Sequence, residues 1–346
     1  MKKSLIVVLL MALTVMVLSC SKIEKNNSNV SSGEAQEIVT AEETSFGEQE
    51  ISTNEINVIT EYQLTTEPKV LPAGTDGSSG TLGTYVLFGD WPQSLKEDNV
   101  TIDGSSTVKV NGWDCYKGND GYYYVKLTAR PGSEKFNNGS YIKAGEEYFF
   151  KIEPIKWRVF SNDYQGGKLL VAENQLVCGR FDSGLNEYRI INEEYISEYN
   201  YQYSIVRAFL NGLDGTNYNV EDFSKTGFIY RAFTEKALEL IKTIDVNTPK
   251  SEMTQDKVFL LTSKILSNKN YGFYGKAIEP DYKRKRMPTD LCYALSAYGT
   301  TWWLRNPSLN HEPRRDGPYC VAWDDSIGYG PVNHISGYVP ALVISF

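Results

Sequence analysis

The C-terminal segment, residues 302–346, constrains the fold more than any other part of the chain. It opens with the run WWLRNP (residues 302–307) and closes with the apolar run ALVI (residues 341–344). The WWLR run predicts a short strand with one Trp on each face, and Pro307 removes a backbone donor where that strand would stop. Because the closing run is apolar on consecutive residues, it is typical of a strand buried on both faces, and we expect it inside a sheet.

Between these two runs, residues 308–338 are rich in Gly, Pro, Asn, Asp, Ser, His and Tyr. That composition is typical of successive turns rather than of a long helix or sheet. We therefore expect an irregular segment at the surface, held between two fixed strands. The side chains predicted to face inward and fix the backbone are Trp302, Trp303, Leu304, Ile327, Val332, Ala341, Leu342 and Ile344.

The N-terminus has the pattern of an export signal. Lys2 and Lys3 precede a continuous apolar stretch, residues 5–18, that is too short to be interpreted first as a membrane-spanning helix. The run VLSC (residues 17–20) is similar to a lipobox, which predicts a signal peptide over residues 1–20 and lipid attachment at Cys20. Ser21 after the cysteine favours transport to the outer membrane and display at the cell surface. The alternative is a plain secretory signal with an incidental cysteine.

Residues 21–80 differ in composition from the rest of the chain. They contain eleven acidic and three basic residues, few aromatic residues, and much Asn, Ser, Glu, Thr and Gly. Such a segment cannot bury enough apolar surface to offset its ordering entropy, so it predicts a disordered acidic tether. The remaining residues, 81–346, are long enough for one large domain.

The domain is nearly neutral, because the acidic tether carries a net charge of −8, equal to that of the whole chain, and the +2 of residues 1–20 leaves −2 for residues 81–346. A near-neutral domain has no electrostatic footprint for nucleic acid. Its one basic cluster is KRKR (residues 283–286). This cluster is either a solvated loop or a site for an anionic ligand or anionic lipid.

Hydrophobic patterning predicts an α+β domain. Strands are predicted at residues 85–88, 122–127, 148–160 with a break at Pro154, and 168–171, and residues 97–121 predict a surface hairpin.

Three helices are predicted after these strands. Ser204 caps the first, which Gly212 ends; Thr234 caps the second, whose apolar stripe runs to Ile244. The run MPTD (residues 287–290) opens the third, which ends at Gly299. Strands flanked by a few helices favour α+β over a doubly wound parallel sheet.

Five short motifs occur in order: YVLFGDWPQ (85–93), PIKWRV (154–159), KVFLL (257–261), WWLR (302–305) and GYVPALV (337–343). With these motifs in register, the chain resembles bacterial domains of the formylglycine-generating-enzyme (sulfatase-modifying factor) branch of the C-type lectin fold. Together with the lipoprotein start, it resembles the treponemal variable lipoproteins diversified by retroelements. The resemblance implies a C-type lectin-like fold whose region 302–346 is variable and binds a ligand. The family often has GVRPAL in the closing motif; this chain has GYVPAL, so the role of that Arg is not carried over.

The sequence offers little support for an enzyme or a metal site. It lacks the G-x-S-x-G, Walker, dinucleotide-glycine and H-E-x-x-H patterns. The spacing of His311, His334 and the pair Asp324-Asp325 matches no metal-ligand motif. The runs EPR (312–314) and WDD (323–325) are superficially similar to calcium-dependent lectin signatures, but Arg314 places a cation where calcium needs an amide oxygen. We therefore expect no metal and no cofactor.

The cysteines also argue against carrying over the enzymatic activity. The formylglycine-generating enzymes use paired redox cysteines near the C-terminus, whereas Cys115, Cys178, Cys292 and Cys320 are dispersed and form no C-x-x-C. Four exported cysteines allow up to two disulfides, and their pairing is open.

The C-terminal composition supports a binding surface. In the diversified relatives, template Asn codons are rewritten at adenines, which cannot yield Lys, Gln or Met, and residues 306–346 contain none of the three. Glu312 and Trp323 do not fit that origin. Large polar and aromatic side chains on one face are suited to an adaptable contact with an external protein or glycan. The predicted ligand-binding residues are Leu309, His311, Arg314, Arg315, Asp316, Tyr319, Trp323, Asp324, Tyr329, Pro331, Asn333, His334, Ser336 and Tyr338.

The predicted function is therefore ligand binding without chemistry, by a lipoprotein anchored to the membrane through Cys20. Two alternatives stay open. One is a formylglycine-generating-type enzyme or other oxidoreductase. The other is a structural envelope lipoprotein whose C-terminal segment only stabilises the fold.

Overall fold

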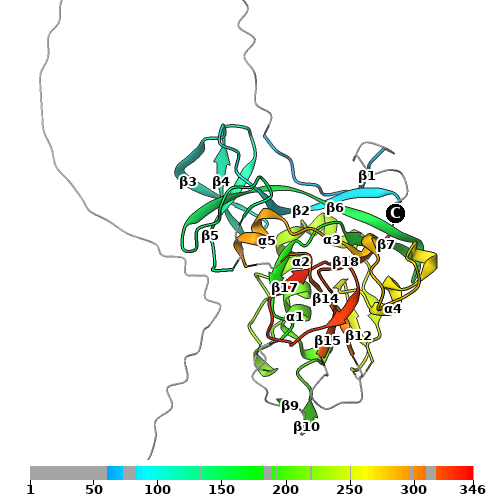
Figure 1. Cartoon of the computed structure of the whole chain (residues 1–346). Helices are drawn as coiled ribbons and strands as arrows, with labels where there is room; N and C mark the ends of the chain where they lie inside the picture. The colour runs from blue at the N-terminus through cyan, green and yellow to red at the C-terminus, as the bar shows by residue number, and fades with distance from the viewer. Residues whose placement is uncertain are drawn as a thin grey trace, which may run out of the picture. The chain divides into compact units, whose positions relative to one another are not determined.

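Two β-sheets built from distant parts of the chain form the centre of the fold (Figure 1). The computed structural model describes residues 61–72, 83–132, 135–182, 189–191, 193–218, 220–249, 251–296, 299–308 and 317–345. All of them belong to one compact unit, Asn57–Phe346.

The strands and helices alternate irregularly along the chain. The strands are β1 (Lys69–Val70), β2 (Tyr85–Leu95), β3 (Ile102–Val110), β4 (Trp113–Gly118), β5 (Tyr123–Thr128), β6 (Glu147–Tyr164), β7 (Gly167–Ala172), β8 (Val177–Gly179), β9 (Arg189–Ile191), β10 (Glu194–Ile196), β11 (Ile244–Val246), β12 (Thr254–Asp256), β13 (Val258–Phe259), β14 (Trp302–Ser308), β15 (Gly317–Val321), β16 (Ile327–Tyr329), β17 (Ser336–Tyr338) and β18 (Ala341–Ile344). The α-helices are α1 (Ile205–Asn211), α2 (Phe228–Ala232), α3 (Glu235–Leu240), α4 (Ser263–Leu266) and α5 (Asp290–Ala294), and the 3-10 turns are η1 (Tyr201–Tyr203), η2 (Thr216–Tyr218), η3 (Lys269–Tyr271) and η4 (Tyr282–Arg284). This content confirms the α+β class.

The long strand β6 organises the nine-stranded sheet. It pairs with β5 at its start, with β2 along its middle and with β7 at its end, all antiparallel. The predicted break at Pro154 is wrong, because β6 runs on through it. Pro154 lies opposite Asp90, where the pairing register shifts in a bulge of β2. Gly89 occupies that bulge with φ +67, and a Cβ there would lie 2.4 Å from the Phe233 ring, so only glycine fits.

The five-stranded sheet has the order β16-β15-β14-β17-β8 and is called here the tail sheet. The expectation that residues 308–338 are irregular is wrong, because β15, β16 and β17 lie within them. The closing strand β18 instead joins the other sheet, between β13 and β7, with Leu342 opposite both Val258 and Leu170. Its predicted place inside a sheet is therefore confirmed.

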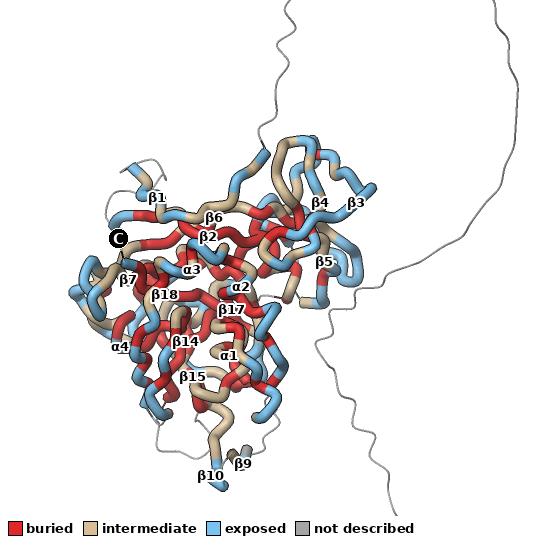
Figure 2. The backbone as a smooth tube through the Cα atoms, turned by 180° about the vertical axis from the view of Figure 1, so that it is seen from behind, coloured by how far each residue is buried: buried red, intermediate tan, exposed pale blue. Residues whose placement is uncertain are grey.

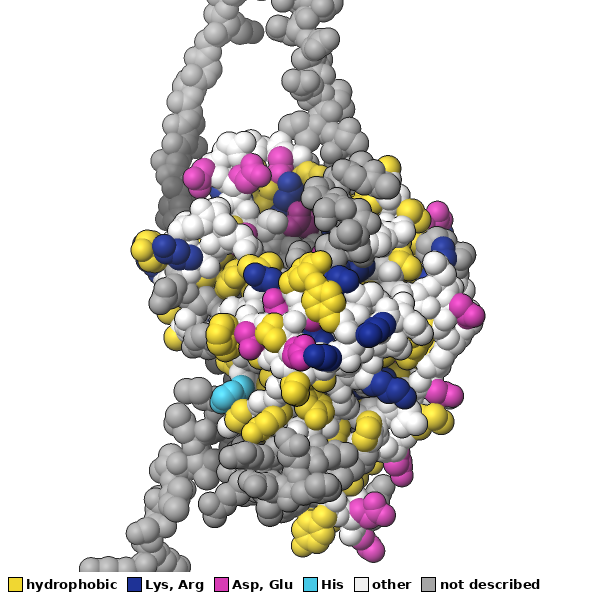
Figure 3. Space-filling view, turned by 45° about the vertical axis from the view of Figure 1, so that its right-hand side comes forward, with side chains coloured by type: hydrophobic (Ala, Val, Ile, Leu, Met, Phe, Trp, Pro, Cys, Tyr) yellow, Lys and Arg dark blue, Asp and Glu magenta, His cyan; other side chains and the backbone are white. Residues whose placement is uncertain are grey.

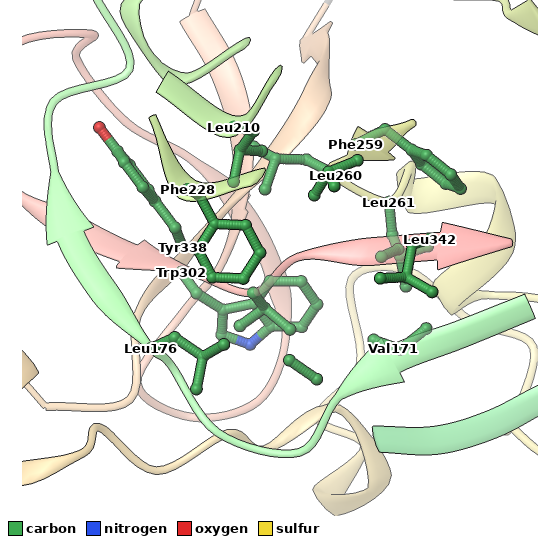
Figure 4. Close-up of a cluster of buried hydrophobic side chains, with 14 of the residues drawn as sticks. Val171, Leu176, Leu210, Phe228, Phe259, Leu260, Leu261, Trp302, Tyr338 and Leu342 are labelled. Carbon is green, nitrogen blue, oxygen red and sulfur yellow. The ribbon is translucent and has the colours of Figure 1, made fainter. Parts of the chain in front are cut away.

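A single apolar cluster joins the two sheets and the helices. Figure 2 shows the buried backbone (red) running through β2, β6, β7, β14 and β18. Figure 4 shows Trp302 and Tyr338 of the tail sheet packed among Leu176, Leu210 and Phe228. All eight side chains predicted to face inward are buried. Burial of each large apolar side chain stabilises the fold by roughly 1.5–3 kcal/mol, so both ends of the tail are firmly fixed.

The starts of α1 and α3 follow the two predicted caps, and α5 begins within the run 287–290 that was predicted to open it. The side chains of Ser204, Thr234 and Thr289 each accept a hydrogen bond from the backbone of the first turn of α1, α3 and α5. Gly212 ends α1 in the left-handed conformation, as predicted. The other two helices are shorter than predicted: α3 ends before Ile244, which lies in β11, and α5 ends well before Gly299.

The domain begins before residue 81, because residues 61–72 pack against it. Tyr62 stacks on Tyr122 with ring centroids 4.8 Å apart, and β1 pairs with β2. The buried Asp90 carboxylate accepts a hydrogen bond from the Thr65 N–H at 2.7 Å and another from the Tyr62 hydroxyl. The assignment of residues 61–72 to the disordered tether is thus wrong. The predicted signal peptide and Cys20 lie outside the described residues.

Within the described part of the chain, every helix is too short or too polar to cross a membrane.

Candidate functional site

A tight turn between β15 and β16 carries the most exposed large aromatic side chain of the predicted site. Trp323 is 80 % exposed, at the second residue of the turn 322–326. The Asp324 carboxylate accepts hydrogen bonds from the Ser326 N–H at 3.1 Å and the Ser326 hydroxyl at 2.7 Å. Asp325 has φ +64 and donates its N–H to the Ala322 carbonyl at 3.0 Å. Local hydrogen bonds therefore shape the backbone that presents the indole.

A buried arginine supports this turn from the interior. Arg284 has no exposed surface and donates from its guanidinium to the Asp325 carbonyl at 3.1 Å. The Asp281 N–H donates to the same carbonyl at 3.2 Å, and the Ile327 N–H donates to the Ala277 carbonyl at 2.9 Å. The remaining acceptors of the Arg284 guanidinium are the carbonyl oxygens of Leu266, Lys276, Ala277 and Glu279.

A second exposed turn follows β16. Pro331, Asn333 and His334 are exposed, and the His334 N–H donates to the Pro331 carbonyl at 3.0 Å. Val332 between them is 3 % exposed, and its carbonyl oxygen accepts hydrogen bonds from the backbone N–H groups of Phe181 and Asp182. One inward residue thus fixes the three outward ones.

The two strands that lead into these turns carry opposed tyrosines. Tyr319 of β15 lies opposite Tyr329 of β16 in the pairing register, so both rings are on the same face. Tyr329 is 42 % exposed and Tyr319 is partly buried.

Six predicted site residues are exposed, and we call them the tail surface. They are Trp323, Asp324, Tyr329, Pro331, Asn333 and His334.

Two predicted site residues are wrong. Ser336 and Tyr338 are 5 % and 4 % exposed; β17 lies inside the tail sheet between β14 and β8, and Tyr338 belongs to the main apolar cluster. The Tyr338 ring packs 5.9 Å from that of Phe209, and its hydroxyl donates to the Arg180 carbonyl. Five further predicted residues lie outside the described residues: Leu309, His311, Arg314, Arg315 and Asp316.

The structure adds an aromatic loop, residues 272–287, that the sequence did not indicate as part of the site. Tyr274, Ile278 and Tyr282 are 52 %, 84 % and 56 % exposed, and the two tyrosine rings lie 6.0 Å apart. The Asp281 carboxylate orders this loop by accepting the N–H groups of Tyr274 at 2.8 Å and Lys283 at 3.1 Å. The only sequence signal was the density of Tyr, Gly and Pro around an aspartate, which is typical of a structured turn.

The basic cluster within that loop is not the solvated loop that we considered. Arg284 and Arg286 are buried, whereas Lys285 between them is exposed. Arg286 donates to the carbonyl oxygens of Ala172 and Lys283, and burial lowers its pKa to about 10. Two of the four cations therefore bind backbone carbonyls and are not available to an external anion.

The site carries mixed charge. Hydrogen bonds from Ser326 hold the pKa of the Asp324 carboxyl below its usual range, whereas burial raises the pKa of Asp325. Figure 3 shows one face of the domain with hydrophobic side chains (yellow) among basic and acidic ones, without a continuous patch of either charge. Such a surface suits a protein or glycan better than a polyanion.

The four cysteines within the described residues, Cys115, Cys178, Cys292 and Cys320, are free, buried thiols. Burial raises the pKa of Cys115 and of Cys320 to about 12, which is opposite to the environment of a catalytic cysteine. The structure brings two of them together, because the Cys178 thiol lies 3.3 Å from the Cys292 carbonyl oxygen. Among the described residues, no three His, Cys, Asp or Glu side chains converge as metal ligands do.

The tail sheet and both exposed turns lie in a segment that matches a known family. Residues 165–345 match the family described as Domain of unknown function, DUF6273. The chain belongs to the DUF6273 family. No curated protein and no solved structure gives a significant match. The DUF6273 segment contains every strand of the tail sheet. It contains only part of the nine-stranded sheet, because β7 lies inside the segment but pairs with β6, which precedes it.

Proposed function

We propose that this chain is a lipoprotein, displayed at the cell surface of a bacterium, that binds an external protein or glycan through the tail surface. The lipobox-like run ending at Cys20 and the acidic segment after it support the display. The tail surface supports the binding.

The observation that carries the proposal is the contrast between Trp323 and its frame. Trp302 and Trp303 are fully buried in the same sheet, whereas Trp323 is 80 % exposed on a turn fixed by Arg284. A rigid, exposed indole offers large contact area at little entropic cost, which is the chemistry of a binding hot spot or of a platform for a sugar ring. A tail that served only to stabilise the fold would gain nothing from exposing it.

The aromatic loop extends the proposed surface. It lies against the Trp323 turn through the Asp281–Asp325 and Ile327–Ala277 backbone hydrogen bonds. Tyr274, Ile278 and Tyr282 would then contribute apolar contact beside the indole.

The finer proposal is a C-type lectin-like scaffold of the formylglycine-generating-enzyme branch whose tail codons are diversified by a retroelement. Its support is the set of five motifs and the lack of Lys, Gln and Met in residues 306–346. Sequencing the DNA beside the gene tests it. A near-copy of the tail's coding sequence, differing only at template adenines, is expected; a locus without one contradicts diversification and leaves ligand binding to be tested by itself.

The binding proposal is tested by probing arrays of glycans and of extracellular proteins with the full chain and with a variant that replaces Trp323, Tyr329 and His334 by Ala. We expect the variant to keep its melting temperature and to lose the contacts that the native chain makes. If the C-terminal segment only stabilised the fold, the variant would show the reverse: a lower melting temperature and an unchanged array pattern. The matched control is Tyr141→Ala, because Tyr141 is an aromatic residue that is 69 % exposed and lies outside the tail surface. This variant should keep both the melting temperature and the array pattern of the native chain.

A further inference from the structure

A polar cavity of about 260 Å³ lies where β2, β6 and the start of α5 meet, and we call it the acidic pocket. Gln93 of β2 and Glu153 of β6 line it from the sheet, and Asp290, the first residue of α5, lines it from the helix. Neither the tail surface nor the aromatic tyrosines of the loop contribute to it. The pocket therefore calls for an explanation separate from the proposed binding function.

The charged groups of the pocket have one sign. Glu153 and Asp290 are carboxylates, and no Lys or Arg belongs to the lining, which is otherwise made of amide, hydroxyl, Met and Pro side chains. Burial is the main cause that raises the pKa of Glu153, and the charge of Asp290 raises it further, whereas the hydrogen bonds from Ser94 and the charge of Lys151, two residues away on β6, lower it. A cation in the pocket would offset both effects.

The hydrogen bonds show which acceptors are already occupied. Asp290 accepts the Asn137 N–H on one carboxylate oxygen at 2.7 Å and the Leu95 N–H on the other at 2.9 Å. Glu153 accepts from the Ser94 N–H at 3.1 Å and the Ser94 hydroxyl at 2.5 Å on Oε1 alone. Its second oxygen, Oε2, accepts from no described residue.

Gln93 provides a second free acceptor. The residue is only 7 % exposed, and its Nε2 donates to the carbonyl oxygens of Glu153 and Pro154, both at 3.1 Å. These two bonds fix the amide orientation, since only the nitrogen can donate to carbonyl oxygens. Oε1 accepts no hydrogen bond from the described residues, although it belongs to a side chain that lines the cavity. The oxygen therefore stays open to the cavity, where a ligand that donates hydrogen bonds can reach it.

The number of free acceptors selects the class of ligand. Calcium takes six to eight oxygens, but both oxygens of Asp290 are already engaged, which leaves too few for that ion. An ammonium group has only three donors, and Glu153, Gln93, Asn137 and Asn174, which all line the cavity, carry side-chain oxygens that can accept them. Met287 and Pro288 add apolar surface at the cavity wall. We propose that the acidic pocket binds the ammonium group of a small primary amine, with Glu153 as its counter-ion and Met287 against its carbon chain.

Titration calorimetry of the full chain with n-butylammonium chloride tests this, with n-butanol and calcium chloride as comparison ligands at constant ionic strength. We expect saturable binding of the amine alone. Glu153→Gln keeps the shape and removes the charge, so it should weaken binding at least about tenfold. Glu147→Gln, at an exposed carboxylate on the same strand, should leave it unchanged. Binding should also weaken as the pH falls through the pKa of Glu153, because the carboxylate is then protonated.

A second variant keeps the test decisive if Glu153→Gln destabilises the chain. Met287 is 43 % exposed at the cavity wall, so Met287→Lys should place a tethered ammonium near Glu153, abolish amine binding and raise the melting temperature. Absence of saturable amine binding in the native chain, equal binding by Glu153→Gln, or calcium binding without amine binding would each overturn the proposal. None of these outcomes bears on the tail surface.

Discussion

The guanidinium of Arg284 donates a hydrogen bond to the carbonyl oxygen of Asp325 at 3.1 Å, which ties a fully buried cation to the turn that exposes Trp323. The same guanidinium binds carbonyl oxygens of the aromatic loop. One side chain therefore connects the two parts of the proposed binding surface. Its position explains how the turn beyond the strands β15 and β16 can hold a large exposed side chain in a fixed place.

Replacing Arg284 should destabilise the domain. Arg284→Met leaves several buried carbonyl oxygens without donors, so we expect a loss of roughly 2–4 kcal/mol in the free energy of unfolding. Arg284→Lys should be nearly as harmful, because a single ammonium cannot reproduce the planar fork. Denaturant unfolding measures both. Lys285→Met, at the exposed neighbour, should change stability by less than about 0.5 kcal/mol; equal losses at both positions would refute the structural role assigned to Arg284.

Tyr338 should behave as a core residue. Tyr338→Phe removes the hydroxyl that donates to the Arg180 carbonyl, and we expect a loss of about 1–2 kcal/mol in the free energy of unfolding, with ligand binding unchanged. Tyr329→Phe, on the exposed strand of the same sheet, should leave stability unchanged. A variant of Tyr338 that unfolds like the native chain but loses ligand would restore this residue to the binding site.

The Trp323 turn should respond to acid through Asp324. Since the pKa of Asp324 is lowered in the folded chain by the Ser326 hydrogen bonds, its stabilisation of the turn is present above the usual value of 3.8 and is lost as the pH falls through the lower folded value. The Ser326 amide proton, whose N–H donates to Asp324 Oδ1, should report this loss in an NMR titration, with a midpoint below 3.8. Asp324→Ala should abolish the transition. A midpoint above 3.8 in the native chain would show that the turn does not stabilise the ionised carboxylate.

The closing strand should be indispensable. Leu342 has no exposed surface and lies between β13 and β7, so Leu342→Ala should cost roughly 2–5 kcal/mol in the free energy of unfolding. Ser345→Ala, at the exposed residue that directly follows the strand, is the control and should be neutral. Thermal unfolding compares them; a Leu342→Ala variant as stable as the control would mean that the strand is not part of the cooperative core.

Local signals in the sequence predicted much of the fold. The caps at Ser204 and Thr234, the apolar run of β18 and the inward residues of the tail are each signalled by neighbouring residues in the chain, and the structure confirms them. The sequence could not show that β8, far upstream, covers β17, because strand pairing is set by tertiary contacts. That is why Tyr338 resembled an exposed tyrosine.

The basic cluster, residues 283–286, is a second case in which tertiary contacts override the local sequence signal. Four consecutive cations favour a solvated loop, since isolated charges are costly to bury. The burial of Arg284 and Arg286 is compensated because backbone carbonyls from distant segments accept hydrogen bonds from their guanidinium groups.

The acidic pocket could not be predicted from the sequence either. Nothing in the sequence distinguishes Gln93, and only the cavity beside it and its free Oε1 indicate a site.

The most direct test of the central claim measures ligand and stability together. Once an array identifies a binding partner, its affinity for the native chain and for the Trp323, Tyr329 and His334 triple Ala variant should be compared by calorimetry, alongside the melting temperature of each. Rigid presentation of changeable side chains predicts an affinity loss of at least about a hundredfold with an unchanged melting temperature. Retained affinity, or a melting temperature that falls with the affinity, would contradict it.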